Sequence, residues 1–353
     1  MAGTKLCPVC GVVKRVNKEH EWLGNGKIVQ RANPDHRMVF IEIENLSQMF
    51  SGVEDIIGMS IDRFIVEAKR RATFDFVDHT LPGIVKLVVR VVGMVPVIRN
   101  ITALGIVMGY GNINLVSVKH THSKESVVRV AIKYPYSVPL FRGDLAGSFN
   151  AIRRREVATD YEEIAPDEFI IIGRISQHPL ELQERLQAKA YPHKPGDIAI
   201  EECPECGGPM MLSEYRWDLS RGIIENKERG RRMVLLGPAA LEAVTDDLEK
   251  ELGDTIPHVI VEAERRFIET GFYTVDEVAS EELFRTHLAA RGLGNMRDLE
   301  WREDGLRFRL ENPCLVLVVV GMALGFFELA SGREGHARWE RSEDGDLLVD
   351  ISS

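Results

Sequence analysis

The segment Phe64-Ile65-Val66-Glu67-Ala68-Lys69-Arg70-Arg71 recurs 195 residues later as Val259-Ile260-Val261-Glu262-Ala263-Glu264-Arg265-Arg266. Further matches flank the two segments in the same order along the chain: Cys7 and Cys203, Trp22 and Trp217, Arg37-Met38-Val39 and Arg232-Met233-Val234, Leu46 and Leu241, Gly58 and Gly253, Gly109 and Gly292, Gly111 and Gly294, Gly143 and Gly321, Gly147 and Gly325, and Phe149 and Phe327. A repeat this long indicates tandem duplication of a whole domain rather than a solenoid. We expect a first domain in residues 1–200, with a linker tail from about residue 181, and a second in residues 201–353.

Each copy combines helical and strand patterns, which predicts an α+β fold with helices packed on a small antiparallel sheet. Apolar residues at 3–4 spacing indicate helices, and strict alternation indicates strands with one buried face. The expected ranges are 53–76 and 241–270 for long helices, 128–133 and 306–311 for strands, 138–151 and 314–330 for apolar, glycine-containing helices, and 169–175 and 337–351 for closing strands.

Four of the five cysteines form two knuckles, Cys7-Pro8-Val9-Cys10-Gly11 and Cys203-Pro204-Glu205-Cys206-Gly207. Each knuckle offers two thiolates, and a closed tetrahedral site needs four, as in zinc ribbons and rubredoxin-like sites. We therefore predict one structural site with four cysteine ligands that joins the two copies. Zinc is the expected ion, and iron could occupy the same geometry.

The knuckles lie much farther apart than those of an ordinary zinc ribbon, whose pairs are roughly 15–20 residues apart. If the two copies pack about a pseudo-two-fold axis, their N-terminal knuckles meet and share one metal. Two alternatives remain open from the residues alone. Each knuckle could be completed by a second chain, or each CxxC pair could be redox-active.

Composition and charge predict a soluble, cytoplasmic protein. The chain has 353 residues, a net charge of −10 and a mean hydropathy of −0.10. Residues 1–200 carry +4 and residues 201–353 carry −14, a balance that argues against general nucleic-acid binding. The longest apolar run, 315–327, is too short to span a membrane, and the N-terminus lacks the apolar core of a signal peptide.

The first copy contains an apolar insertion within residues 81–105 that has no counterpart in the second copy. Such a run most simply forms a buried helix or an interdomain contact. It could instead cover an apolar cavity. A third interpretation is a peripheral membrane contact, with Lys86, Arg90 and Arg99 at the surface.

The C-terminal part of each copy resembles the 4-vinyl reductase-like, or hydrocarbon-binding, domain family. The residues that carry the resemblance are Gly292-Leu293-Gly294, Asn312-Pro313-Cys314, Gly321, Gly325, Phe327 and Glu328, with Gly109-Tyr110-Gly111, Tyr134-Pro135, Gly143, Gly147 and Phe149 as weaker counterparts. The resemblance implies an α+β fold related to trafficking-particle subunits, with an apolar pocket. The cysteine cluster of the family's sensors is missing here, because only Cys314 stands at that place and Tyr136 occupies the matching position.

No dinucleotide-binding, P-loop, nucleophile-elbow or zinc-protease motif is present in the sequence. We therefore expect a non-enzymatic protein that binds or senses an apolar, hydrocarbon-like small molecule. The candidate ligand-binding residues are Ile84, Val88, Tyr136, Phe149, Cys314, Val318 and Phe327. One alternative is a protein–protein interaction, assembly or regulatory module. A second is an enzyme or accessory factor of aromatic or tetrapyrrole metabolism.

Overall fold

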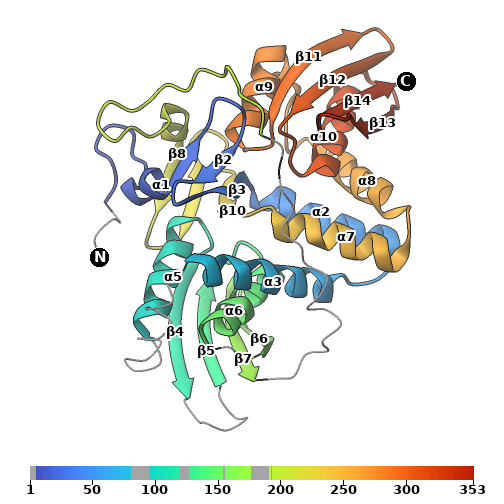
Figure 1. The fold of residues 1–353 in the computed structure, drawn as a ribbon. Coiled ribbons are helices and arrows are strands. Elements are labelled where there is room, and N and C mark those ends of the chain that lie inside the picture. The colour runs from blue at the N-terminus through green and yellow to red at the C-terminus, as the bar shows by residue number, and fades with distance from the viewer. Residues whose placement is uncertain (1–4, 81–94, 120–126, 154–155, 176–190, 192) are drawn as a thin grey trace.

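The chain folds as an α+β protein built on three antiparallel sheets (Figure 1). A computed structural model describes residues 5–80, 95–119, 127–153, 156–175, 191 and 193–353. A six-stranded sheet occupies the centre. A four-stranded sheet flanks it on either side, one from each half of the chain.

The central sheet is assembled from both halves of the chain, in the strand order β1-β2-β3-β10-β9-β8. Its strands are β1 (His20–Trp22), β2 (Ile28–Gln30), β3 (Asn33–Glu42), β8 (Tyr215–Asp218), β9 (Ile223–Asn226) and β10 (Arg232–Leu236). β3 pairs with β10, so that Phe40 lies opposite Leu235. The backbone hydrogen bonds of these two strands therefore tie the halves together.

The two outer sheets have the same strand order, β4-β5-β7-β6 in the first half and β11-β12-β14-β13 in the second. Their strands are β4 (Asn112–Lys119), β5 (Val127–Lys133), β6 (Val157–Ala165), β7 (Glu168–Ile175), β11 (Asn295–Arg302), β12 (Gly305–Glu311), β13 (His336–Arg341) and β14 (Leu347–Ser352). The predicted alternation is confirmed. Val128 and Val130 are buried while Arg129 is exposed, and Leu306 and Phe308 are buried while Arg307 is exposed.

Helices cover these sheets and connect them. The α-helices are α1 (Lys14–Glu19), α2 (Ile43–Ile57), α3 (Asp62–Thr80), α5 (Val95–Val107), α6 (Val138–Arg153), α7 (Ala239–Leu252), α8 (Ile256–Glu269), α9 (Glu281–Ala290) and α10 (Val316–Ser331), and the 3-10 helices are η2 (Met210–Glu214) and η3 (Val275–Val278). The two glycine-containing apolar segments form α6 and α10, as predicted. Of the apolar insertion, residues 81–94 lie outside the described part of the chain, and the rest belongs to α5.

The prediction of one continuous long helix in each copy is wrong. Each range holds two helices, α2 and α3 in the first half and α7 and α8 in the second. The breaks fall at Gly58 and Gly253, which have φ angles of +72° and +97°. Glycine adopts these left-handed angles without strain, so it ends one helix and redirects the chain into the next.

The first helix of each pair packs against the opposite half of the chain. α2 packs on α8 of the second half, and α7 packs on α3 of the first half. The contact between α2 and α8 is close, because a Cβ atom on Gly52 would lie 3.0 Å from the Cβ of Ala263. The boundary near residue 200 stays a prediction, and each packed unit contains a helix from the other half of the chain.

Small residues let α6 and α10 approach their neighbouring helices in the same way. A Cβ atom on Gly143 would lie 2.6 Å from the Cβ of Lys69, and one on Gly321 would lie 2.6 Å from the Cβ of Glu264. Lys69 and Glu264 are also aligned in the sequence repeat. The two side chains thus occupy equivalent places in the two packed units, although common ancestry of the halves stays a prediction.

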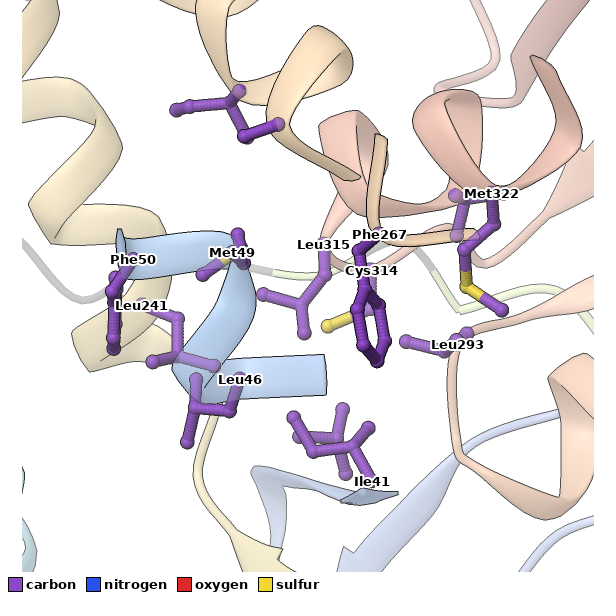
Figure 2. Close-up of a cluster of buried hydrophobic side chains, with 14 of the residues drawn as sticks. Ile41, Leu46, Met49, Phe50, Leu241, Phe267, Leu293, Cys314, Leu315 and Met322 are labelled. Atoms are coloured by element: carbon purple, nitrogen blue, oxygen red, sulfur yellow. The ribbon is translucent and has the colours of Figure 1, made fainter. Parts of the chain in front are cut away.

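The largest core crosses between the halves of the chain. In Figure 2, Ile41, Leu46 and Met49 of the first half lie beside Leu293 and Leu315 of the second. A smaller core lies under the cysteine knuckles and the central sheet, and it includes Trp22 and Trp217. Removal of this apolar surface from water favours the assembled pair of halves over either half alone.

Candidate metal centre and ligand cavity

The four knuckle cysteines converge on one point, as predicted. Their four Sγ atoms all lie within 4.8 Å of one another. The Sγ atoms of Cys7 and Cys203 are 3.8 Å apart, and those of Cys10 and Cys206 are 3.5 Å apart. A tetrahedral zinc site with bonds of about 2.3 Å places its sulfur atoms about 3.8 Å from one another. The cluster could therefore hold one metal ion with four sulfur ligands, and the two knuckles share it.

The backbone of each knuckle is fixed by matching hydrogen bonds. The N–H of Gly11 donates to the carbonyl of Cys7 at 3.0 Å, and the N–H of Gly207 donates to the carbonyl of Cys203 at 2.8 Å. Both glycines are left-handed, with φ angles of +74° and +65°. This turn folds the two sulfurs of each knuckle toward the same side, which explains the need for glycine after the second cysteine.

The centre is closed and mostly buried. Cys7, Cys10 and Cys203 are each 2% exposed, and burial raises the pKa of Cys10. The side-chain amide of Asn17 donates to the Sγ of Cys206 at 3.1 Å. Asn17 was not among the predicted site residues, because no sequence spacing links it to a knuckle. A four-sulfur shell leaves no open coordination position, so the centre fits a structural ion rather than a catalytic one.

A large cavity lies in the first half, between its outer sheet, the surrounding helices and the central sheet. Its volume is about 940 Å³. Its apolar walls come from α3, α5, α6 and the outer sheet and include Phe76, Val77, Ile98, Ile101, Leu104, Ile113, Val130, Phe141, Leu145, Phe149 and Ile152. This is within the size range of small-molecule sites, roughly 300–1,000 Å³.

The corresponding space in the second half is filled. A void of only about 10 Å³ remains there, beside Tyr273, Arg291 and Met322. Aromatic rings occupy the rest, since Tyr273 and Phe284 each pack edge-on against Phe326 at centroid distances of 6.0 Å. The hollow is therefore specific to the first half and does not follow from the shared fold.

Two residue pairs account for part of this difference. The repeat aligns Ala72 with Phe267 and Ser148 with Phe326. Ala72 and Ser148 both line the cavity, whereas Phe267 and Phe326 are buried in the core of the second half. Small side chains in the first half thus leave open the volume that phenyl rings fill in the second.

Polar side chains form one part of the cavity wall. The Lys69 ammonium lies 3.3 Å from the Asp144 carboxylate, which also accepts hydrogen bonds from the hydroxyls of Thr73 at 2.8 Å and Tyr136 at 2.6 Å. His36 lines the same wall. Burial and then the nearby Lys69 ammonium lower the pKa of His36 to about 4, so its imidazole is neutral at pH 7.

The structure scatters the predicted ligand residues. Phe149 lines the cavity, and Tyr136 lies behind its wall, stacked on Tyr110 with ring centroids 4.3 Å apart. Val318 and Phe327 belong to α10 in the second half and do not line this cavity.

Cys314 lies in the core of the second half, near Leu293 and Leu315 (Figure 2). It is fully buried, and burial raises the pKa of its thiol to about 12. It therefore packs as a neutral, small apolar side chain. Ile84 and Val88 lie outside the described residues.

The cavity residues that were not predicted include Lys69, Ala72, Asp144 and Ser148. The repeat held a usable signal, because it aligns small residues with Phe267 and Phe326. Which of these positions face a common space became clear only from the packing of α3 against α6.

Comparisons of this chain with protein-family models, with curated proteins and with solved structures find no match. The resemblance to hydrocarbon-binding domains thus stays a hypothesis. No helix within the described ranges has both the length and the apolar character needed to cross a bilayer.

Proposed function

We propose that the protein is a non-enzymatic small-molecule binding protein whose apolar ligand occupies the first-half cavity. The observation that carries the proposal is the contrast between the halves, with about 940 Å³ open in the first and about 10 Å³ in the second. Empty apolar volume costs a protein stability, and the second half shows that this fold can close the space. A function that needs the space accounts for its retention.

In the same proposal, a zinc ion held by the four cysteines has a structural role. The four cysteines that would hold the ion lie where the N-terminal segments of the two halves meet. Thiolates from both halves must be in place to bind it, so binding stabilises the joined arrangement. Sensing or carrying the ligand would then depend on how the halves are held together.

The neutral fluorophore N-phenyl-1-naphthylamine tests this proposal. We expect the purified chain to bind it with saturable fluorescence enhancement. Replacing Ser148 with Phe, the residue at the aligned position of the second half, should weaken that binding at least about tenfold, because the ring enters the cavity and takes volume from the probe. A phenylalanine at exposed Ala158 is the matched control and should leave binding unchanged. If Ser148→Phe binds the probe as tightly as wild type, the cavity is not the binding site.

A further inference from the structure

Lys69 is a buried cation on the wall of the proposed ligand cavity. Its side chain is 6% exposed, and lysine is rarely buried to this extent unless it is paired. Asp144 is its carboxylate partner, with the ammonium nitrogen 3.3 Å from a carboxylate oxygen. An ammonium group has three N–H donors. Among the described residues, no other side-chain oxygen is bound to it.

Asp144, in contrast, is well supplied with donors. One of its oxygens accepts from Thr73 and lies near Lys69, while the other accepts from Tyr136. Its negative charge is therefore balanced and hydrogen-bonded inside the protein. The unused hydrogen-bonding capacity of this cluster lies on the cationic partner, where an acceptor group of a ligand would be bound.

The equivalent position in the filled half carries an acidic residue that belongs to the core. Glu264 is fully buried, and it accepts a hydrogen bond of 2.6 Å from the side-chain amide of Asn45. The residue aligned with Asp144 is Met322. At these two aligned positions, a buried lysine–aspartate pair is therefore present in the half that contains the large cavity and absent from the other half.

The other acidic residues on the cavity wall do not compete for Lys69. Asp247 is paired with the Arg71 guanidinium, and Asp75 and Asp246 have interactions of their own. Asp35 is exposed. Around Lys69 the polar part of the wall includes the neutral His36 and the aromatic ring of Tyr110, 5.8 Å from the ammonium. A second buried lysine, Lys27, lines the cavity elsewhere and has interactions of its own.

The geometry points to an apolar ligand with one anionic group, such as a carboxylate, bound with that group at Lys69 and its apolar body along Phe149, Ile101 and Phe141. This inference rests on the proposed function, since it names the ligand class of the same cavity. A close charge pair in a site shielded from water contributes both affinity and orientation. An uncharged hydrocarbon would leave the Lys69 donors without a partner, at a cost in binding free energy.

Two fluorophores with the same anilinonaphthalene skeleton test the inference. 1-Anilinonaphthalene-8-sulfonate carries an anionic group, and N-phenyl-1-naphthylamine lacks it. We expect wild type to bind the sulfonate at least about tenfold more tightly than the neutral probe. Lys69→Met should abolish this preference and leave the dissociation constant of the neutral probe within about threefold. Lys133→Met, which removes a half-exposed lysine paired with Glu168, should keep the preference.

Asp144 variants separate attraction by Lys69 from repulsion by a carboxylate left unpaired. Asp144→Asn frees the ammonium and should tighten binding of the sulfonate several-fold. In the double variant Lys69→Met/Asp144→Asn the sulfonate should bind no better than the neutral probe. Recovery of the preference in that double variant would show that Asp144 repulsion caused the loss, and it would overturn the inference. Near-ultraviolet circular dichroism confirms that each variant is folded.

The outcomes also distinguish this inference from the proposed function. One outcome is that the neutral probe binds wild type, binds Ser148→Phe more weakly, and has the same dissociation constant as the sulfonate. That outcome would support the cavity as the binding site and contradict an anionic ligand. If neither probe binds wild type, or if Ser148→Phe changes neither, the proposed function itself is contradicted.

Discussion

Trp22 and Trp217 make the same hydrogen bond, each to the opposite half of the chain. The indole N–H of Trp22 donates to the carbonyl of Ala290 in the second half, and that of Trp217 donates to the carbonyl of Val107 in the first, both at 3.1 Å. The two acceptors are the last residues of α9 and α5. Each half thus completes the other, through strand pairing, helix packing and this pair of hydrogen bonds.

From this reciprocity we expect that neither half folds alone. With a protease site inserted within residues 181–190, in the predicted linker tail, cleavage should leave the two fragments associated on size-exclusion chromatography. Each fragment expressed alone should lack the β3–β10 pairing. It should also expose the apolar face of the helix that packs on the other half, which is α2 in the first fragment and α7 in the second. The uncut chain with the same insertion is the control. Monomeric fragments that each unfold cooperatively would contradict the exchanged arrangement.

Loss of one knuckle cysteine should remove the metal and loosen the junction. We expect Cys7→Ser and Cys203→Ser each to reduce bound zinc from one ion per chain to none, as measured by elemental analysis. The free energy of unfolding should fall by at least about 3 kcal/mol, because binding of the metal is coupled to folding. Cys314→Ala, at a buried cysteine outside the cluster, should keep the zinc. Unchanged metal content in both serine variants would mean that the knuckles do not share an ion.

Local patterns in the sequence were sufficient for features that depend on one segment or on a fixed stoichiometry. The alternation at Val128 and Val130 correctly predicted which face of the strand is buried. Because a tetrahedral metal site needs four ligands, the two knuckles correctly predicted that Cys7 and Cys203 lie close together. The break at Gly58 was missed because apolar periodicity continues through it, although only its left-handed conformation ends the helix.

Such patterns could not predict that α2 and α7 each pack on the opposite half of the chain, and they could not predict the cavity. Periodicity shows that a helix has an apolar face, but not which half of the chain that face meets. The hollow likewise depends on Ala72 and Ser148 facing one common space, and their distance in sequence conceals it. Phe327 was chosen from the resemblance and lies in a filled core, because the sequence pattern does not show which half contains a cavity.

The contrast between the halves predicts that substitutions by alanine at aligned positions lower the free energy of unfolding by unequal amounts. Phe326→Ala should destabilise the protein by about 3–5 kcal/mol, because it removes a fully buried ring from a filled core. Ser148→Ala, at the edge of an existing cavity, should change the free energy of unfolding by less than about 1 kcal/mol. Urea denaturation of both variants and wild type at one pH measures the difference. A cost of less than about 1 kcal/mol for Phe326→Ala would mean that the core of the second half is not filled around this ring.

Glu264 gives a pH dependence of stability whose sign is fixed by its burial. Burial raises the pKa of this carboxyl from 4.5 to about 8, despite the opposing hydrogen bond from Asn45. Between these two values the folded state holds a proton that the unfolded state has released. The contribution of this group to the free energy of unfolding is therefore fully present below about pH 4.5 and is lost as the pH rises toward 8.

Replacing this carboxyl by an amide removes that dependence. We expect Glu264→Gln to match wild type near pH 5 and to exceed its free energy of unfolding by on the order of 4 kcal/mol at about pH 8.5. Glu262→Gln is the control, because Arg265 and Arg266 lower the pKa of Glu262 and it stays ionised in both states across this range. Since the other titrating groups, His287 among them, are common to all three proteins, the difference between the urea midpoints at each pH isolates Glu264. Parallel stability curves for wild type and Glu264→Gln across this pH range would show that Glu264 is ionised in the folded core.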